Sequence, residues 1–176
     1  CRQQRGRPLS ATYDLIFRGG AIANHDGVGR GDVAIRDGRI AALGDLGRAD
    51  AREIVDVTGL HILPGVVDSQ VHLREPGNEY KEDLETGGRA AVLGGVTTVF
   101  EMPNTKPPTT SPEALADKVA RARHRMYCDF AFYGAATTEN VDLLAAMERE
   151  PGCCGIKIFM GSSTGALLVA AAEGVR

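Results

Sequence analysis

The first third of the chain alternates hydrophobic and polar residues in short segments that glycines separate. Alternation over four to eight residues is typical of β-strands with one buried face. The dipeptide Asp37-Gly38 separates two such segments, and it favours a tight type I′ hairpin because both turn positions need positive φ. The pattern therefore predicts a small antiparallel β unit over residues 13–61. Its strands are expected at 14–18, 31–36, 39–43 and 53–57.

Beyond Pro64 the pattern changes to apolar runs that alternate with longer amphipathic segments. Apolar runs are typical of strands buried on both faces, and repeated strand–helix units favour a parallel sheet. Ser111-Pro112 is a typical helix start, with serine as N-cap and proline at the first helical position. The pattern predicts strands at 62–71, 96–102, 128–136 and 154–160, and helices at 80–93, 112–125 and 138–148.

Two α/β architectures fit this order of elements, a doubly wound sheet and a (β/α)8 barrel. No Gly-x-Gly-x-x-Gly follows a predicted strand, which argues against a dinucleotide-binding sheet. Polar residues collect instead at strand ends, where barrel enzymes build their sites. We therefore expect residues 62–176 to form the first half of a (β/α)8 TIM-type barrel. The polar residues concerned are Asp68, Gln70, His72, Glu101, Asn104 and Lys157.

Composition excludes several classes of protein. The chain has 176 residues, of which 43% are hydrophobic and 24% charged, as in ordinary globular domains. A net charge of -3 gives no electrostatic reason to expect nucleic acid or an anionic membrane as a partner. The four cysteines lack Cys-x-x-Cys spacing, and no apolar run fits a membrane span or a secretory signal. We expect a cytoplasmic protein with a small-molecule ligand. Residues 1–12 are expected to be an unstructured leader, and the chain to be part of a longer protein.

The strongest candidate chemistry lies in residues 63–77. Alternate residues of a strand point the same way, so Asp68, Gln70 and His72 would share one face, joined by Arg74 if the strand continues. Such a row of side chains can bind a metal ion or an anion. The alternative interpretation is a capped strand that ends in a turn.

Five short motifs follow one another along the chain. They are Pro-Gly-x-x-Asp-x-x-x-His at 64–72, His72-Leu-Arg74-Glu-Pro, Gly-Gly-Val-Thr-Thr at 94–98, Met102-Pro-Asn104-Thr and Gly155-Ile-Lys157-Ile-Phe-Met-Gly. With these motifs the sequence resembles the amidohydrolase superfamily, and within it the cyclic amidohydrolases, most closely dihydroorotase, with hydantoinase and allantoinase as near relatives. The resemblance implies that the β unit is the N-terminal part of a β-sandwich. It also implies reversible hydrolysis of dihydroorotate to N-carbamoyl-aspartate, a step of pyrimidine biosynthesis that uses one or two divalent metal ions, normally Zn2+.

The resemblance implies a metal role for several of these residues. His72 would be a ligand, Lys157 would be carbamylated and bridge two metal ions, and Asp68 would support the ligands from behind. Gln70 stands where such enzymes have the first histidine of a His-x-His pair. A neutral amide is a poor ligand for zinc, which prefers Cys, His and carboxylates, so Gln70 puts metal occupancy in question.

The resemblance also implies a grip on the substrate. Arg74 and Asn104 match a dihydroorotase pair that holds the substrate's carboxylate, and a guanidinium can do so through two parallel hydrogen bonds. Glu101, at the end of the second predicted barrel strand, is expected to be a solvated strand cap.

Three interpretations of the function remain open at this stage. In dihydroorotase the general base and two further histidine ligands would lie beyond Arg176, so no catalytic base is expected within the chain and it is expected to be inactive alone. Hydantoinase or allantoinase activity is the second possibility. The third is a non-catalytic scaffold that holds aspartate transcarbamoylase, which Gln70 favours and the retained His72, Arg74, Asn104 and Lys157 oppose. The full-length protein is expected to be a homo-oligomer.

Overall fold

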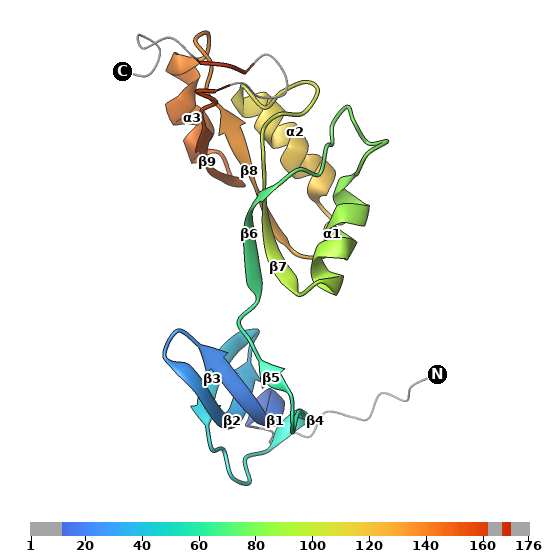
Figure 1. Ribbon diagram of the computed structural model, residues 1–176, viewed down its shortest axis with the longest axis vertical. Coiled ribbons are helices and arrows are strands. Elements are labelled where there is room, and N and C mark those ends of the chain that lie inside the picture. Colours follow the sequence, from blue (N-terminus) through green and yellow to red (C-terminus); the bar gives the residue numbers. More distant parts are fainter. Residues whose placement is uncertain (1–11, 162–166, 170–176) are drawn as a thin grey trace. The chain divides into compact units, whose positions relative to one another are not determined.

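The computed structural model describes residues 12–161 and 167–169, in two compact units that meet between Pro64 and Gly65 (Figure 1). Of the expected leader at 1–12, all but Thr12 lies outside the described residues. The boundary falls slightly later than the sequence predicts, because Ile62 pairs with a strand of the first unit. Within the described residues, no helix is long and apolar enough to cross a lipid bilayer.

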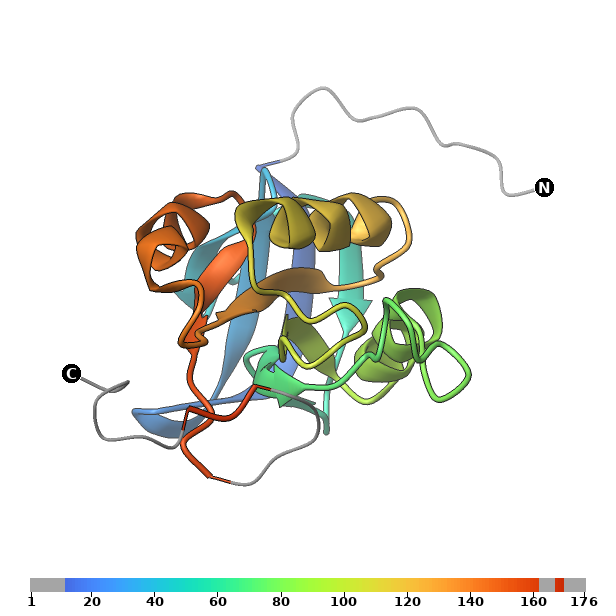
Figure 2. The same ribbon diagram turned by 90° about the horizontal axis from the view of Figure 1, so that it is seen from above.

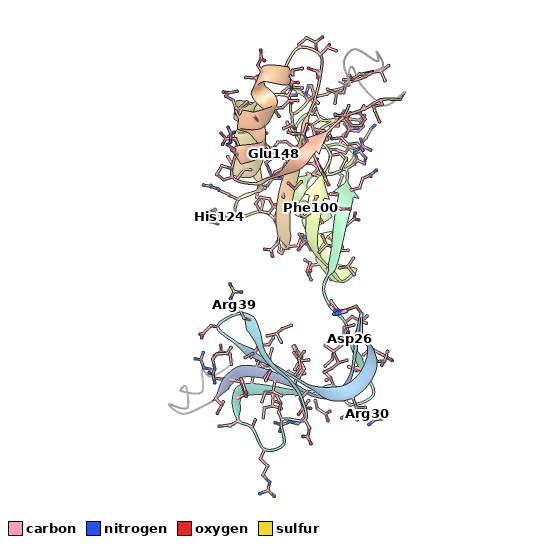
Figure 3. All side chains as sticks on the ribbon, turned by 90° about the vertical axis from the view of Figure 1, so that its left-hand side faces the viewer. Asp26, Arg30, Arg39, Phe100, His124 and Glu148 are labelled. Carbon is pink, nitrogen blue, oxygen red and sulfur yellow. The ribbon has the colours of Figure 1, made fainter. Side chains whose placement is uncertain are left out.

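The first unit is a five-stranded sheet in the order β3-β2-β1-β4, with β5 also paired to β1. The turn at Asp37 (φ 52°) and Gly38 (φ 71°) is formed as predicted. Asp26 and Arg39 lie at two hairpin turns and are exposed (Figure 3). The sheet is mixed, however, because β4 and β5 run parallel to β1, so the prediction of a purely antiparallel unit was wrong. The strands are β1 (Tyr13–Asn24), β2 (Gly27–Arg36), β3 (Arg39–Gly44), β4 (Ala51–Asp56) and β5 (His61–Ile62).

The second unit is a four-stranded parallel sheet in the order β6-β7-β8-β9, with three α-helices on one side of it (Figure 2). The parallel pairing confirms the repeated strand–helix units that the sequence predicts. Leu84 and Leu115 of the helices pack against Val99 and Phe132 of the sheet in the largest apolar cluster. The elements are β6 (Val66–Val71), α1 (Leu84–Leu93), β7 (Val96–Glu101), α2 (Pro112–Ala122), β8 (Asp129–Ala135), the 3-10 helix η1 (Val141–Leu143), α3 (Leu144–Arg149) and β9 (Cys153–Lys157).

Element boundaries follow local capping chemistry. Ser111 is the N-cap of α2 as predicted, and its Oγ accepts a hydrogen bond from the Ala114 N–H (3.2 Å). Helix α1 begins later than the predicted Tyr80, because Asp83 is its N-cap and accepts from the Thr86 N–H (2.8 Å). The predicted strand at 62–71 is interrupted between β5 and β6, where Pro64 has no N–H to offer a sheet. The predicted helix at 138–148 is divided into η1 and α3.

Two loops leave the carboxyl ends of neighbouring strands. The β6–α1 loop is residues 72–83, and the β7–α2 loop is residues 102–111. The Lys106 N–H donates to the Pro76 carbonyl (2.9 Å) and joins them. Gly77, at φ 94°, lies against Lys106, where a side chain would not fit.

Asn140 fastens the β7–α2 loop to the end of β8. Its Nδ2 donates to the carbonyls of Thr110 (2.7 Å) and Ala135 (2.8 Å), and its Oδ1 accepts from the Thr137 N–H (2.8 Å). Thr110 and Thr137 lie outside the strands, and Ala135 is the last residue of β8. The loop is therefore anchored by a buried side chain.

Candidate functional site

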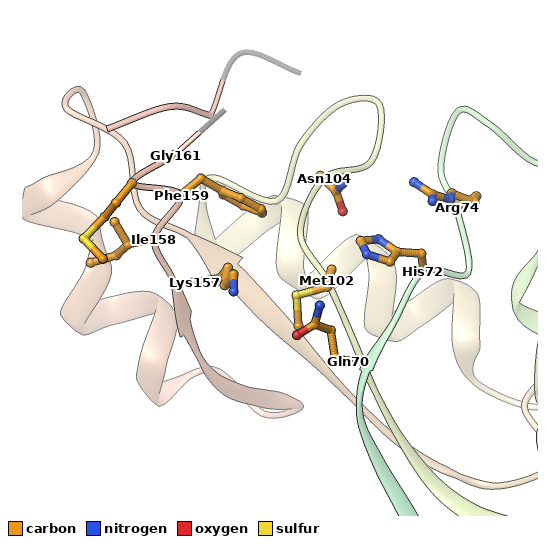
Figure 4. Close-up of a pocket in the computed structure, with 10 residues that line it drawn as sticks. Gln70, His72, Arg74, Met102, Asn104, Lys157, Ile158, Phe159 and Gly161 are labelled. Atoms are coloured by element: carbon orange, nitrogen blue, oxygen red, sulfur yellow. The ribbon is translucent and has the colours of Figure 1, made fainter. Parts of the chain in front are cut away.

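A cavity of about 580 Å3 lies at the carboxyl ends of the parallel strands (Figure 4). The resemblance implies a metal or substrate role for six residues, and the cavity brings together five of them, Gln70, His72, Arg74, Asn104 and Lys157. Asp68 is not among its lining residues; it is exposed, and its Oδ1 accepts from the Gln70 N–H (3.0 Å). The lining residues are Gln70, His72, Arg74, Met102, Asn104, Lys157, Ile158, Phe159, Met160 and Gly161.

His72 follows β6 directly and is partly buried. Burial lowers the pKa of its imidazole, and the nearby positive charge of Arg74 lowers it further. A hydrogen bond with the Asn104 side chain acts in the opposite direction and raises the pKa, but the net effect is a lowering. The ring is therefore neutral at neutral pH and has a nitrogen lone pair to offer.

Arg74 reaches the cavity by a route that strand alternation does not predict. Strand β6 ends at Val71, where the sequence predicts the strand to end, and Arg74 adopts a left-handed conformation with φ 64°. The strand does not continue, so Arg74 is not part of its face. The next residue, Glu75, is 4% exposed and accepts two hydrogen bonds from Arg125, in the turn that follows α2 (2.7 and 3.0 Å). Arg74 thus projects from a loop that is anchored on both sides.

The cavity is electropositive. Figure 4 shows the side chains of Arg74 and Asn104 pointing toward each other above the His72 ring, with Lys157 across the cavity from Gln70. Lys157 ends β9, and its Nζ lies 5.6 Å from the centre of the Phe159 ring. None of the described lining residues is acidic. This combination favours an anionic ligand, or an anionic group on a ring.

The described donor set does not by itself fit a divalent metal. Among the described residues, no three His, Cys, Asp or Glu side chains gather closely enough to hold a metal ion. In the cavity, His72 offers one imidazole, whereas Gln70 offers a neutral amide and Arg74 and Lys157 offer cationic groups. Zinc sites need several imidazole, thiolate or carboxylate ligands. The predicted metal roles of His72, Asp68 and carbamylated Lys157 therefore stay predictions.

A buried ion pair beneath the cavity is the feature that sequence reasoning missed. Glu101 was expected to be a solvated cap, but it is 1% exposed, and its Oε2 lies 3.0 Å from Nζ of Lys118. Burial raises the pKa of Glu101 and lowers that of Lys118, while each charge opposes the effect on its partner. The signal was present in α2, where Lys118 shares the buried stripe of Leu115 and Ala122.

Comparison with protein families matches residues 59–150, more than half of the chain, to the dihydro-orotase-like family. The chain belongs to the dihydroorotase-like family. It is an amidohydrolase sequence, as the motifs around His72 and Asn104 predict, and its match corresponds to the N-terminal portion of its homologues.

Curated relatives of this dihydroorotase-like chain include allantoinases. One from Deinococcus radiodurans is 39% identical over 153 residues, which cover 86% of this chain and 34% of that protein. One from Desulfitobacterium hafniense is 38% identical over 148 residues, covering 84% of this chain and 33% of that protein. The chain spans about a third of the length of the curated relatives that it matches.

Solved structures of hydantoinases share its fold. The L-hydantoinase (dihydropyrimidinase) from Arthrobacter aurescens aligns with a TM-score of 0.83 and 31% identity, over 93% of this chain and 36% of that one. A D-hydantoinase from Bacillus sp. AR9 aligns with a TM-score of 0.76 and 27% identity, over 92% of this chain and 36% of that one. These similarities extend over both units of the dihydroorotase-like chain.

Proposed function

We propose that this dihydroorotase-like chain contributes the ring-binding part of an active site that opens a cyclic amide, and that the ring carries a carboxylate, as dihydroorotate does. One observation carries the proposal: Arg74, Asn104 and Lys157 converge on a cavity whose described lining has no acidic residue. An uncharged ring would leave two cations without a counter-charge, whereas a carboxylate on the ring supplies one.

Each of these side chains has a role that its chemistry supports. The Arg74 guanidinium binds the ring's carboxylate through two parallel hydrogen bonds, and the Asn104 amide orients it. Lys157 stabilises the negative charge that develops on the amide oxygen as the ring opens. The neutral imidazole of His72 contacts the bound substrate ring. No step is assigned to a metal ion, because the described donors do not fit one by themselves.

We further propose that β6 to β9 are half of a (β/α)8 barrel and that the first unit is part of a β-sandwich. The likeness to L-hydantoinase over 93% of the chain supports both proposals. They also account for the exposure of Val66 (53%) and Val67 (54%) on the edge strand β6, since a closed barrel leaves no edge.

Hydrolysis of allantoin is the second candidate. Its support is the set of curated allantoinases that are 38–39% identical to this chain. Allantoin carries no carboxylate, so in an allantoinase Arg74 would have no anionic group of the substrate to bind. A scaffold role beside aspartate transcarbamoylase is the alternative if no ring binds.

The test is calorimetric titration of the chain with dihydroorotate, dihydrouracil and allantoin. Dihydrouracil is the dihydroorotate ring without its carboxylate. We expect dihydroorotate to bind about tenfold to a hundredfold more tightly than dihydrouracil, and Arg74→Met to abolish that preference, because a hydrogen bond to a charged group contributes about 1.5–3 kcal/mol.

Arg89→Met, at an exposed position within α1, is the matched control and should keep the preference. Equal affinity for dihydroorotate and dihydrouracil would contradict the proposal. Tighter binding of allantoin than of dihydroorotate would favour the second candidate.

A further inference from the structure

Arg74 is the middle residue of a three-residue turn. The Glu75 N–H donates to the Leu73 carbonyl (2.9 Å), and Arg74 between them has φ 64°, which makes a γ-turn of the rare, strained kind with positive φ. Among the described residues other than glycine, only Asp37 and His124 also have positive φ, and both are of types that adopt it more readily than arginine. Neighbouring contacts therefore have to hold Arg74 in this conformation.

The residues on either side of Arg74 are both anchored in the interior. Leu73 is buried and belongs to the apolar cluster of the second unit. Glu75 is also buried, and its Oε2 accepts a hydrogen bond from the N–H of Leu84, the first residue of α1 (3.2 Å). Since both neighbours are held in the core, the side chain between them is left to point into the cavity, toward Asn104 (Figure 4).

Arg125 binds the same carboxylate from a third element. Its Nη1 and Nη2 donate to Oε1 and Oε2 of Glu75 (2.7 and 3.0 Å), a paired geometry that fixes the orientation of a carboxylate as well as its position. Arg125 lies in the turn after α2, where its own N–H donates to the carbonyl of Ala122, the last helical residue (3.1 Å). The Glu75 carboxylate is therefore bound to the start of α1 and to the turn after α2.

Joining the two helices does not by itself require an ion pair at this position. Burying a carboxylate is costly, and apolar residues of similar volume often replace such a pair without loss of stability. The Arg125 side chain is also 36% exposed, so solvent screens the attraction. What an apolar contact would not supply is a set of directional bonds that fixes the backbone at Glu75, next to Arg74 in the chain.

We propose that Glu75 and Arg125 are positioning residues for substrate specificity: their paired hydrogen bonds hold the turn at residues 73–75 closed, and the closed turn aims the Arg74 guanidinium at the carboxylate of the ring. Neither residue lines the cavity, so both act through Arg74. The inference rests on the proposed function, which supplies the carboxylate-bearing ring.

The test is Arg125→Met, which removes a guanidinium outside the cavity and keeps an unbranched side chain. We expect amide hydrogen exchange to become about tenfold faster at Glu75 and Asn78, whose N–H groups donate to the carbonyls of Leu73 (2.9 Å) and Arg74 (3.1 Å). We also expect affinity for dihydroorotate to fall about tenfold, because Arg74 loses its fixed orientation. Affinity for dihydrouracil, which has no carboxylate, should not change.

Arg121→Met is the matched control. Arg121 lies one turn earlier and is similarly exposed (41%), but it donates to Asp117 (2.6 Å), and its Nη1 lies 4.0 Å from Oε1 of Glu75, beyond hydrogen-bond distance. This variant should leave the exchange rates and both affinities unchanged. If Arg125→Met does not fold, Glu75→Gln/Arg125→Met leaves no buried charge unpaired and keeps an acceptor for the Leu84 N–H. The same exchange and binding differences are expected from it.

Unchanged exchange at Glu75 and Asn78 in a folded variant would overturn the proposal. An equal loss of affinity for both rings would also overturn it, as would a loss of the same size in Arg121→Met. A parent chain that binds neither ring, or both equally, would instead contradict the proposed function. In that case the exchange measurement still decides the inference, because faster exchange supports the positioning role and unchanged exchange refutes it.

Discussion

Replacing Gly77 tests whether the two cavity loops are rigidly joined. A Cβ on Gly77 would lie 2.2 Å from the Lys106 carbonyl oxygen and 2.5 Å from the Lys106 Cβ. Both loops are held at this distance by the hydrogen bond from the Lys106 N–H to the Pro76 carbonyl (2.9 Å). In Gly77→Ala the loops must separate by about 1 Å to reach ordinary van der Waals contact.

The expected cost has two parts. An alanine at φ 94° costs about 1–2 kcal/mol because its Cβ meets the backbone in left-handed conformations. Stretching the hydrogen bond between the loops removes about 0.5–1.5 kcal/mol more. Gly77→Ala should therefore lower the free energy of unfolding by about 1.5–3.5 kcal/mol. It should also weaken dihydroorotate binding, since a shift of about 1 Å moves Arg74 relative to Asn104.

Urea denaturation followed by circular dichroism measures the free energy of unfolding, and calorimetry measures the affinity for dihydroorotate. Gly95→Ala is the matched control, because Gly95 has nearly the same φ (86°) and a Cβ placed on it would meet nothing within 4 Å. It should lose only the conformational part, about 1–2 kcal/mol, and keep ligand affinity. Equal losses in the two variants would refute the reasoning and show that the loops move apart freely.

Two further predictions concern the cavity itself. Gln70→His should place a second imidazole beside His72 and raise the zinc content that metal analysis finds after dialysis. The control Ser69→His, at the neighbouring position of the strand, should not raise it. Equal zinc content in the two variants would show that Gln70 does not limit metal binding. Burial lowers the pKa of His72 in the folded chain. As the pH falls, the imidazole of His72 is therefore protonated in the unfolded chain before it is protonated in the folded chain, so the free energy of unfolding should decrease from about pH 7 to about pH 5. Urea midpoints across this range should show a shallower decrease in His72→Gln, and identical slopes would contradict the prediction.

Much of the order of elements could be predicted because it depends on local chemistry. The N-cap at Ser111 and the turn at Asp37-Gly38 are encoded within a few residues, and both are formed as predicted. The direction of β4 could not be predicted, because its partner β1 lies far away in the sequence and a strand's own pattern does not state whether its neighbour is parallel.

The candidate site shows the same division. The motifs place Gln70, His72, Asn104 and Lys157 at strand ends, and the structure brings them to one cavity. Arg74 also reaches it, although by a left-handed turn that anchoring through Glu75 supports and that alternation cannot predict. Glu101 is buried because Lys118 meets it from another element, and such a pairing across the fold has no local signature.

Asn140 has a consequence for the chemical ageing of the protein. Slow deamidation would turn its side chain into an aspartate, and the two N–H donors that now serve the carbonyls of Thr110 and Ala135 would become a carboxylate oxygen facing them. Attraction would change to repulsion at the buried side chain that anchors the β7–α2 loop to Ala135. A single spontaneous change, with no mutation in the gene, would then weaken the anchoring of the loop that carries Asn104.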